Sequence, residues 1–293
     1  MSDFKSAATY QLIWPDSLGT VYTINGGSGL SHISLDGTGI PTPLHSFNPY
    51  ILSDGGIDDG YKLDVRRMVW KIHITGATEE LFDMARAYLF FLFRPLTDPY
   101  RLRVVTVSGA QRQIDCYVDG PIEIENGDGF TAIATIPLIA PDPIWYDPTA
   151  RSYIVSSWPQ TSITVPYSGT WYEWPIIKVI GQIGVTLTNL ASFIGGGGTV
   201  FRQGQVSITA VPAGHTWTID LHPAKKTIVN QVNANVLNTA IGTSSIGVGG
   251  FLEFRLWPEP IKASGANTMT VSHTSPSGSP SIEFYYFDRY IAL

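Results

Sequence analysis

Hydrophobic and polar residues alternate over most of this chain, and this period of two is the pattern of β-strands with one buried face. The clearest run follows Tyr61 and has apolar side chains at every second position: Met68, Trp70, Ile72 and Ile74. It predicts a central strand of a sheet. Residues 1–60 contain only short apolar runs between glycine and proline clusters, so we predict short strands and long loops there.

One segment has the period of a helix and predicts an α-helix over residues 79–93. Thr78 can cap its free N–H groups, two glutamates occupy its first turn, and Arg94-Pro95 ends it. Its apolar stripe, which we expect to lie on the sheet, consists of Leu81, Ala85, Tyr88, Leu89 and Leu92.

Phe90 lies on the opposite side of this helix, close to Asp83, Arg86 and Arg94. Two interpretations remain open. Phe90 is an ordinary exposed aromatic residue, or it belongs to a subunit contact, since aromatic residues ringed by charges are typical of interfaces. We therefore take Phe90, Arg86 and Arg94 as a candidate subunit contact.

Further strands are predicted at residues 101–107, 113–118, 122–125 and 130–139. The last two flank Asn126-Gly127, a strong hairpin signal because both residues accept positive φ. Prolines 141 and 143 then stop strand pairing. We place a domain boundary near residues 148–160, so that residues 1–150 form a β-rich domain with one helix and residues 151–293 form a second domain.

The second domain reads as almost purely β. Alternating segments predict eight strands, at 176–180, 185–188, 206–211, 215–221, 228–236, 251–257, 268–273 and 282–286. Short strands separated by turn signals predict a two-sheet sandwich or jelly roll. The glycine run 195–198 is expected to be a flexible connection.

Composition narrows the possible classes. The 293 residues are 44% hydrophobic and 14% charged, which excludes a disordered chain, a coiled coil and a basic nucleic-acid binder. Residues 1–150 hold 18 acidic and 10 basic residues, a net charge of −8, whereas residues 151–293 hold 6 and 8, a net charge of +2. With no signal peptide and no long apolar span, we expect a soluble protein made in the cytoplasm.

Catalytic and metal-binding patterns are absent from the sequence. The single cysteine, Cys116, alternates with Ile114 and Val118, which predicts a small core residue and excludes a disulfide framework. Residues 54–60 resemble a calcium loop but would place Val65 where a bidentate glutamate is needed. We predict no enzyme, cofactor or metal; a hydrolase would require two acids that converge in a cleft.

Several motifs occur in an order that resembles the distal tail proteins of phages with long, non-contractile tails (siphophages). They are IAPDPIWY at 139–146, GTWYEWPIIKVIG at 169–181, a strand ending at Asn189, Gly204, and WTID at 217–220. The residues that carry this resemblance, all expected to be structural, are Pro141, Asp142, Pro143, Trp145, Tyr146, Trp174, Pro175, Gly181, Asn189 and Trp217.

This resemblance implies a ring-forming N-terminal domain, followed by a galectin-like sandwich. It implies a homohexameric ring in the virion, at the distal end of the tail, made in the bacterial host cytoplasm. Its partners would be the tail tube protein, the tail-tip hub protein, the tape measure protein and receptor-binding proteins. The acidic N-terminal half would then line a channel through which phage DNA passes without specific binding.

The alternative from a different class is a carbohydrate-binding module that recognises host surface glycans. Eight tryptophans and a β-rich second domain offer some support for it. Exposed tryptophan or tyrosine side chains clustered on one face of the sandwich would favour this alternative.

Overall fold

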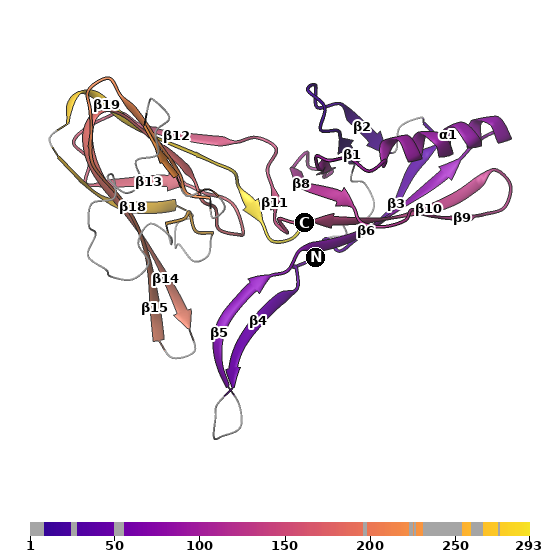
Figure 1. The fold of residues 1–293 in the computed structure, drawn as a ribbon, viewed down its shortest axis with the longest axis horizontal. Helices are drawn as coiled ribbons and strands as arrows, with labels where there is room; N and C mark the ends of the chain where they lie inside the picture. Colours follow the sequence, from indigo (N-terminus) through magenta and orange to yellow (C-terminus); the bar gives the residue numbers. More distant parts are fainter. Residues whose placement is uncertain are drawn as a thin grey trace. The chain divides into compact units, whose positions relative to one another are not determined.

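The structure is a computed structural model that describes residues 9–24, 28–49, 56–195, 198–222, 225, 227–230, 254–258, 266–274 and 276–293. It confirms the predicted mainly-β fold with an α-helix in the N-terminal half (Figure 1). The chain divides into two compact units. Unit 1 comprises residues 1–148 and 291–293, and unit 2 comprises residues 149–290. No helix among the described residues has both the length and the apolar character that a membrane span requires.

Unit 1 is built on an antiparallel sheet with the order β2-β1-β7-β8-β10-β6-β3. β9 pairs with the N-terminal half of β10, residues 132–135. The strand bounds are β1 Thr9–Ile13, β2 Val21–Ile24, β3 Leu30–Asp36, β6 Arg66–Thr75, β7 Tyr100–Val105, β8 Gln111–Val118, β9 Glu123–Asn126, β10 Thr131–Ala140 and β11 Trp145–Tyr146.

The central strand β6 confirms the predicted alternation. Its side chains are buried at every second position from Arg66 to Ile74, and those between are exposed or half-buried. It pairs with β10 along its whole length, Thr131 lying opposite Thr75 and Ala140 opposite Arg66. Cys116 on β8 is also fully buried, as predicted, and burial raises the pKa of its thiol to about 12.

Helix α1 spans Glu79–Leu92, one residue shorter than predicted. Thr78 is the N-cap: its hydroxyl accepts a hydrogen bond from the Leu81 N–H at 3.3 Å. Ala85, Leu89 and Leu92 are buried as predicted. The prediction was wrong for Leu81, which is 49% exposed, because its side chain lines a groove instead of packing into the core.

The hairpin between β9 and β10 forms where predicted, with a different turn. The left-handed glycine is Gly129, at φ +68°, whereas Gly127 does not have positive φ and Asn126 is still part of β9, opposite Ala132. The Gly127 N–H donates to the carbonyl of Thr131, which closes a longer loop than a two-residue turn. The pairing of the strands therefore survives, but the Asn-Gly step does not make the turn.

A second hairpin stands apart from the main sheet of unit 1. β4 (Pro43–Pro49) and β5 (Gly56–Leu63) pair only with each other and form a separate two-stranded sheet (Figure 1). The base of this hairpin is closed by the Asp64 N–H, which donates to the Thr42 carbonyl at 2.9 Å. We call residues 43–63 the arm.

Unit 2 is a two-sheet sandwich, which confirms the predicted architecture; its likeness to galectins stays a prediction. One sheet has the order β12-β19-β14-β16-β17, and the other joins β13, β18, the second half of β14, and β15. The strands are β12 Arg151–Val155, β13 Ser162–Pro166, β14 Ile176–Gly195, β15 Gly198–Val211, β16 Thr216–Asp220, β17 Thr227–Val229, β18 Ala266–His273, β19 Ser277–Tyr286 and β20 Arg289–Tyr290.

The long strand β14 differs from the sequence prediction, which divided it into two strands at 176–180 and 185–188. Its first half pairs with β16 and β19, and its second half pairs with β15 and β18. Gly181 lies at the change of sheet, with φ +87° and a register shift against β19 beside it. One strand thus serves both sheets by bending at a bulge.

The predictions missed β12 and β13, and placed strands at 228–236 and 251–257. β17 ends at Val229, and residues 231–236 and 251–253 lie outside the described residues. Leu256 makes only an isolated bridge with Glu173. Gly195 and Gly198 face each other in the β14–β15 hairpin, and the two residues between them lie outside the described part of the chain.

Candidate assembly surface

Exposed apolar side chains gather on unit 1. Among the described residues, the large hydrophobic side chains that are exposed on unit 1 are Leu18, Val21, Ile33, Ile40, Leu44, Tyr61, Leu81, Met84, Phe90, Phe91, Val107, Phe130 and Ile133. Unit 2 contributes Ile154 to the same class. Apolar surface of this kind is typical of protein contacts, so the candidate assembly surface lies on unit 1.

Helix α1 carries four of these exposed side chains. Met84 is 61% exposed, and Phe90 and Phe91 are 43% exposed each. Arg86 and Arg94 are exposed as well; Arg94 follows the end of α1, so the helical spacing to Phe90 holds for Arg86 only. The exposure of Phe90 is confirmed, whereas its role as a subunit contact stays a prediction.

The C-terminal end of α1 is fixed by aromatic side chains. The Trp14 indole N–H donates to the Leu92 carbonyl at 3.1 Å, and the Trp14 and Phe91 rings lie 4.7 Å apart. The Arg94 guanidinium lies 4.6 Å from the Trp14 ring centroid and 5.2 Å from that of Phe91. These cation–π contacts hold a positive charge at the edge of an apolar surface.

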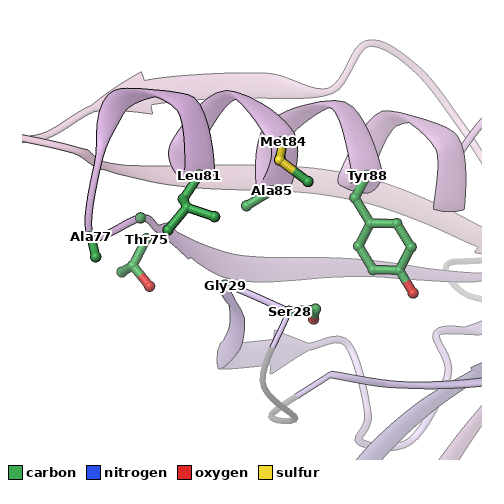
Figure 2. A pocket seen from close by; sticks show the side chains of 9 residues that line it. Ser28, Gly29, Thr75, Ala77, Leu81, Met84, Ala85 and Tyr88 are labelled. Carbon is green, nitrogen blue, oxygen red and sulfur yellow. The ribbon is translucent and has the colours of Figure 1, made fainter.

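The N-terminal half of α1 borders an apolar groove of about 530 Å³ (Figure 2). Leu81, Met84 and Tyr88 extend from the helix toward the segment that carries Ser28 and Gly29. The other lining residues are Thr75, Gly76, Ala77 and Ala85. The sequence analysis did not find this groove, because Leu81 and Tyr88 fall on the helical stripe that predicts core.

Gly29 sets the depth of the groove. It has φ +73°, and a Cβ there would lie 2.5 Å from the Thr75 carbonyl oxygen and 2.9 Å from the Ala85 Cβ. No other residue type fits, because both the left-handed backbone and the close approach of the helix exclude a side chain. Gly29 therefore allows the close approach of β6 and α1 at the floor of the groove.

Arg66 is the other side chain in unit 1 that sequence reasoning missed. It is only 2% exposed, and its guanidinium donates to the carbonyls of Pro143 and Ile291 at 2.7 Å each and of Gly37 at 2.8 Å. It also donates to the Gly39 carbonyl. Burial lowers the pKa of Arg66 to about 10, and the nearby Asp142 carboxylate opposes this shift.

The burial of Arg66 could have been predicted from its position in the alternating pattern of the strand. Arg66 falls on the same alternation as Met68 and Trp70, which places its side chain on the buried face of β6. A buried arginine must satisfy its donors, and here four backbone carbonyls do so. The C-terminal residues 291–293, which the prediction assigned to the second domain, return to unit 1 through this contact.

The motif at 139–146 is structural. The Asp142 carboxylate accepts a hydrogen bond from the Ile144 N–H at 3.2 Å, and Pro143 supplies a carbonyl to Arg66. Trp145 is fully buried, with the Arg66 guanidinium 5.9 Å from its ring centroid. The Tyr146 hydroxyl donates to Asp115 at 2.7 Å, and burial raises its pKa. The remaining residue, Pro141, is exposed.

The motif residues of unit 2 also support the fold. Pro175 is buried, and Trp174 and Trp217 pack half-buried against the sandwich core. A Cβ on Gly181 would lie 3.0 Å from the Pro280 Cα. Asn189 pairs with Gly204 in the β14–β15 register, and its side chain lies outside the described part.

An aromatic cluster in unit 2 bears on the sugar-binding alternative. The Arg255 guanidinium lies 4.5 Å from the ring centroid of Tyr172, 5.0 Å from that of Trp257 and 5.5 Å from that of Trp174. No tryptophan or tyrosine in the described residues of unit 2 is exposed. The rings of this cluster are thus in contact with a half-buried guanidinium, and sugar binding stays an untested alternative.

The arginines of unit 1 that could attract nucleic acid are engaged with other groups. Arg67 pairs with Asp119 at 2.6 Å and Arg101 with Asp115 at 3.1 Å. Arg103 donates to the Gln113 side chain. Carboxylates therefore offset the charges of Arg67 and Arg101, whereas Arg103 and the buried Arg66 keep their charges and have their donors satisfied by neutral groups.

The described residues contain no cluster of three or more histidine, cysteine, aspartate or glutamate side chains able to hold a metal ion. The ring of His32 stacks on Tyr10 at 3.6 Å, and its Nδ1 accepts a hydrogen bond from the Trp70 indole. Burial lowers the pKa of His32. The calcium-like segment at 54–60 falls on residues whose side chains are not described.

Comparison with known proteins identifies the fold. No family model matches the chain, and no curated protein matches it as a relative. The structure of SPP1 Dit, described as a paradigm of the hub adsorption apparatus in phages that infect Gram-positive bacteria, superposes with a TM-score of 0.62. The two chains are 14% identical, and the match covers 96% of this chain and 98% of Dit.

A second match is a protein of the phage P2 baseplate in its activated conformation. It has a TM-score of 0.42 and 10% identity, and the match covers 98% of this chain and all of that one. The motif resemblance to distal tail proteins is thus confirmed at the level of the fold: along almost its whole length, this chain has the fold of SPP1 Dit.

Proposed function

We propose that this chain is a structural protein of the tail tip of a long-tailed phage, where it forms a homohexameric ring between the tail tube and the tail-tip hub. The observation that carries this proposal is the fold shared with SPP1 Dit over 96% of the chain. In the proposed assembly, unit 1 makes the ring and unit 2 provides a platform for receptor-binding proteins.

The distribution of apolar surface supports the assignment of the ring to unit 1. Among the described residues, unit 1 exposes more large hydrophobic side chains than unit 2 does, and apolar surface of this kind is typical of protein contacts. Phe90, between Arg86 and Arg94, is the contact that we assign to a neighbouring subunit. An aromatic side chain within a ring of charges can be buried while the charges stay at the rim of the contact.

The charge distribution supports passage of DNA through the ring. Residues 1–150 carry a net charge of −8. Four arginines that could oppose this are buried or paired with neighbouring groups: Arg66, Arg67, Arg101 and Arg103. An acidic channel repels phosphates, so DNA would pass without adhering. The tape measure protein would occupy the same channel, and no catalytic role is part of the proposal.

Negative-stain imaging with light scattering of the purified chain tests the ring. We expect ring-shaped particles for the wild type and monomers for Phe90→Asp, because the substitution removes the apolar ring from the contact and puts in its place a carboxylate that must lose its hydration when the subunits associate. Ile154→Asp is the matched control, since Ile154 is 56% exposed on unit 2 and should leave the rings intact. Dispersed wild-type monomers would contradict the ring, and intact rings of Phe90→Asp would remove Phe90 from the contact.

The sugar-binding alternative predicts a different result. A glycan array with the full chain should give no signal if unit 2 is a platform for proteins. Specific binding that is lost in Tyr172→Ala would instead favour recognition of a host glycan by the aromatic cluster.

A further inference from the structure

The surface around Phe90 is basic. Residues 84–94 contain two arginines, Arg86 on α1 and Arg94 just after its end, and no acidic residue. Both arginines are exposed, and Phe90 is 43% exposed. The Arg94 guanidinium is held over the rings of Trp14 and Phe91. We call Arg86, Phe90 and Arg94 the basic surface; it offers an aromatic ring and two positive charges to a partner.

A complementary surface lies on the hairpin of β9 and β10. Among the described strands, β9 pairs with β10 alone, so it forms an edge of the sheet (Figure 1). Glu125 of β9 lies opposite Ile133 of β10, and Glu123 lies opposite Thr135. Both glutamates are exposed, Ile133 is 37% exposed, and residues 120–139 contain no basic residue. We call Glu123, Glu125 and Ile133 the acidic edge.

The basic surface and the acidic edge lie on opposite sides of the sheet. The Trp70 ring, on the buried face of β6, lies 5.6 Å from the ring of Phe93, the C-cap of α1, so the helix packs against this face. Thr135 lies opposite Lys71, which is exposed on the other face, two strands inward from β9. Side chains that lie opposite each other in antiparallel strands share a face, so the acidic edge points away from α1.

The charges of the two surfaces are not neutralised within the chain. Three other arginines of unit 1 form ion pairs with aspartates of the same chain, at 2.6–3.1 Å: Arg67, Arg101 and Arg112. In the described part of the chain, Arg86, Arg94, Glu123 and Glu125 form no ion pair. The sheet separates the arginines from the glutamates in one copy, but a neighbouring copy can bring them together.

We propose that the acidic edge of one copy of this chain docks on the basic surface of the next copy, so that Ile133 packs against Phe90 and the two glutamates face Arg86 and Arg94. This inference rests on the proposed ring and names the surface of the neighbour that Phe90 contacts. Because the two surfaces differ and lie on opposite sides of one unit, the contact is head-to-tail, and its repetition closes a ring rather than a two-fold dimer.

Two charge-reversed variants of the full chain test the contact. The edge variant carries Glu123→Lys and Glu125→Lys, and the helix variant carries Arg86→Glu and Arg94→Glu. Each variant alone has like charges on both surfaces, so sedimentation should show about a tenfold rise in the protein concentration at half-assembly. An equimolar mixture should recover rings, because alternating copies of the two variants place opposite charges at every contact.

A matched control and a milder variant accompany these measurements. Asp36→Lys changes an exposed aspartate on β3, at the opposite edge of the sheet, and should leave assembly unchanged. Glu123→Gln with Glu125→Gln removes the charges and keeps the shape, so it should raise the same concentration by about threefold. Circular dichroism verifies that each variant is folded.

The outcomes separate the two proposals. A wild-type chain that does not oligomerise would overturn the ring and this contact together. Wild-type rings that persist in either charge-reversed variant would overturn the contact alone, and the glutamates would then only protect an edge strand from unspecific pairing. An equimolar mixture that stays monomeric, or an equal loss of rings in Asp36→Lys, would also overturn the contact alone.

Discussion

Replacing Arg66 by methionine should strongly destabilise unit 1. Methionine fills much of the volume of the arginine stem but donates no hydrogen bond. The substitution leaves four backbone carbonyls without their donor, those of Gly37, Gly39, Pro143 and Ile291. These carbonyls belong to three segments far apart in the sequence, so one guanidinium holds them together.

The size of the effect follows from how many of these carbonyls water can reach. Gly37 and Gly39 are exposed and can be hydrated, whereas Pro143 and Ile291 are half-buried. A buried acceptor without a partner costs about 1–3 kcal/mol, so two of them give about 4 kcal/mol. This loss corresponds to a fall of about 8–16 °C in the Tm of a domain of this size.

Differential scanning calorimetry and urea unfolding of the full chain measure this loss. We expect the transition of unit 1 to move and that of unit 2 to stay. Arg66→Lys should lie between wild type and Arg66→Met, because lysine has three donors on a single atom instead of a planar fork with five. The Leu293 N–H, which donates to the Thr38 carbonyl at 3.2 Å, should also lose protection from hydrogen exchange.

The adjacent residue is the control. Arg67 pairs with Asp119 at 2.6 Å, but its side chain is 69% exposed, so Arg67→Met should cost at most about 1 kcal/mol. If Arg66→Met unfolds with the same free energy as Arg67→Met, the buried guanidinium does not hold these segments and the reasoning is refuted.

Three further predictions concern other positions. Cys116 should not react with a thiol reagent in the native protein. Its folded pKa of about 12 exceeds the unfolded value of about 8.5, so the stability that its buried thiol contributes is present in full below pH 8.5 and is lost as the pH rises toward 12. Urea titrations at alkaline pH should show this loss in the wild type but not in Cys116→Ala. Thr78→Ala should lower the unfolding free energy by about 1 kcal/mol and Thr78→Ser should retain it; equal loss in both would contradict the cap. Gly181→Ala should cost more than Gly214→Ala, since both have positive φ but only Gly181 lies against Pro280; equal Tm values would contradict the steric contribution.

Much of the fold could be predicted from local pattern. The alternation through β6, the cap at Thr78 and the stripe of Ala85, Leu89 and Leu92 each follow from the period of one element. The burial of Cys116 followed in the same way. These features depend on neighbours in sequence, which a linear pattern records.

The errors arose where a distant segment decides the outcome. Leu81 follows the helical stripe, yet no distant segment covers its side chain, which borders a groove and is 49% exposed. β14 was divided because Gly181 is a breaker in sequence, whereas in the sandwich it is the bend by which one strand enters two sheets. Strand β12 was missed because it lies within the segment read as a domain boundary, and β13 follows directly after that segment.

The sequence by itself determined that this protein is mainly β with a capped helix, that its acidic charge lies in the first half, and that its motifs follow the order seen in distal tail proteins. The tertiary structure alone decided which apolar side chains remain exposed, how Arg66 joins three segments, and that the arm stands apart from its sheet. The physical reason is that periodicity reports which face of an element is apolar, whereas only the packing of elements far apart in the chain decides what covers that face.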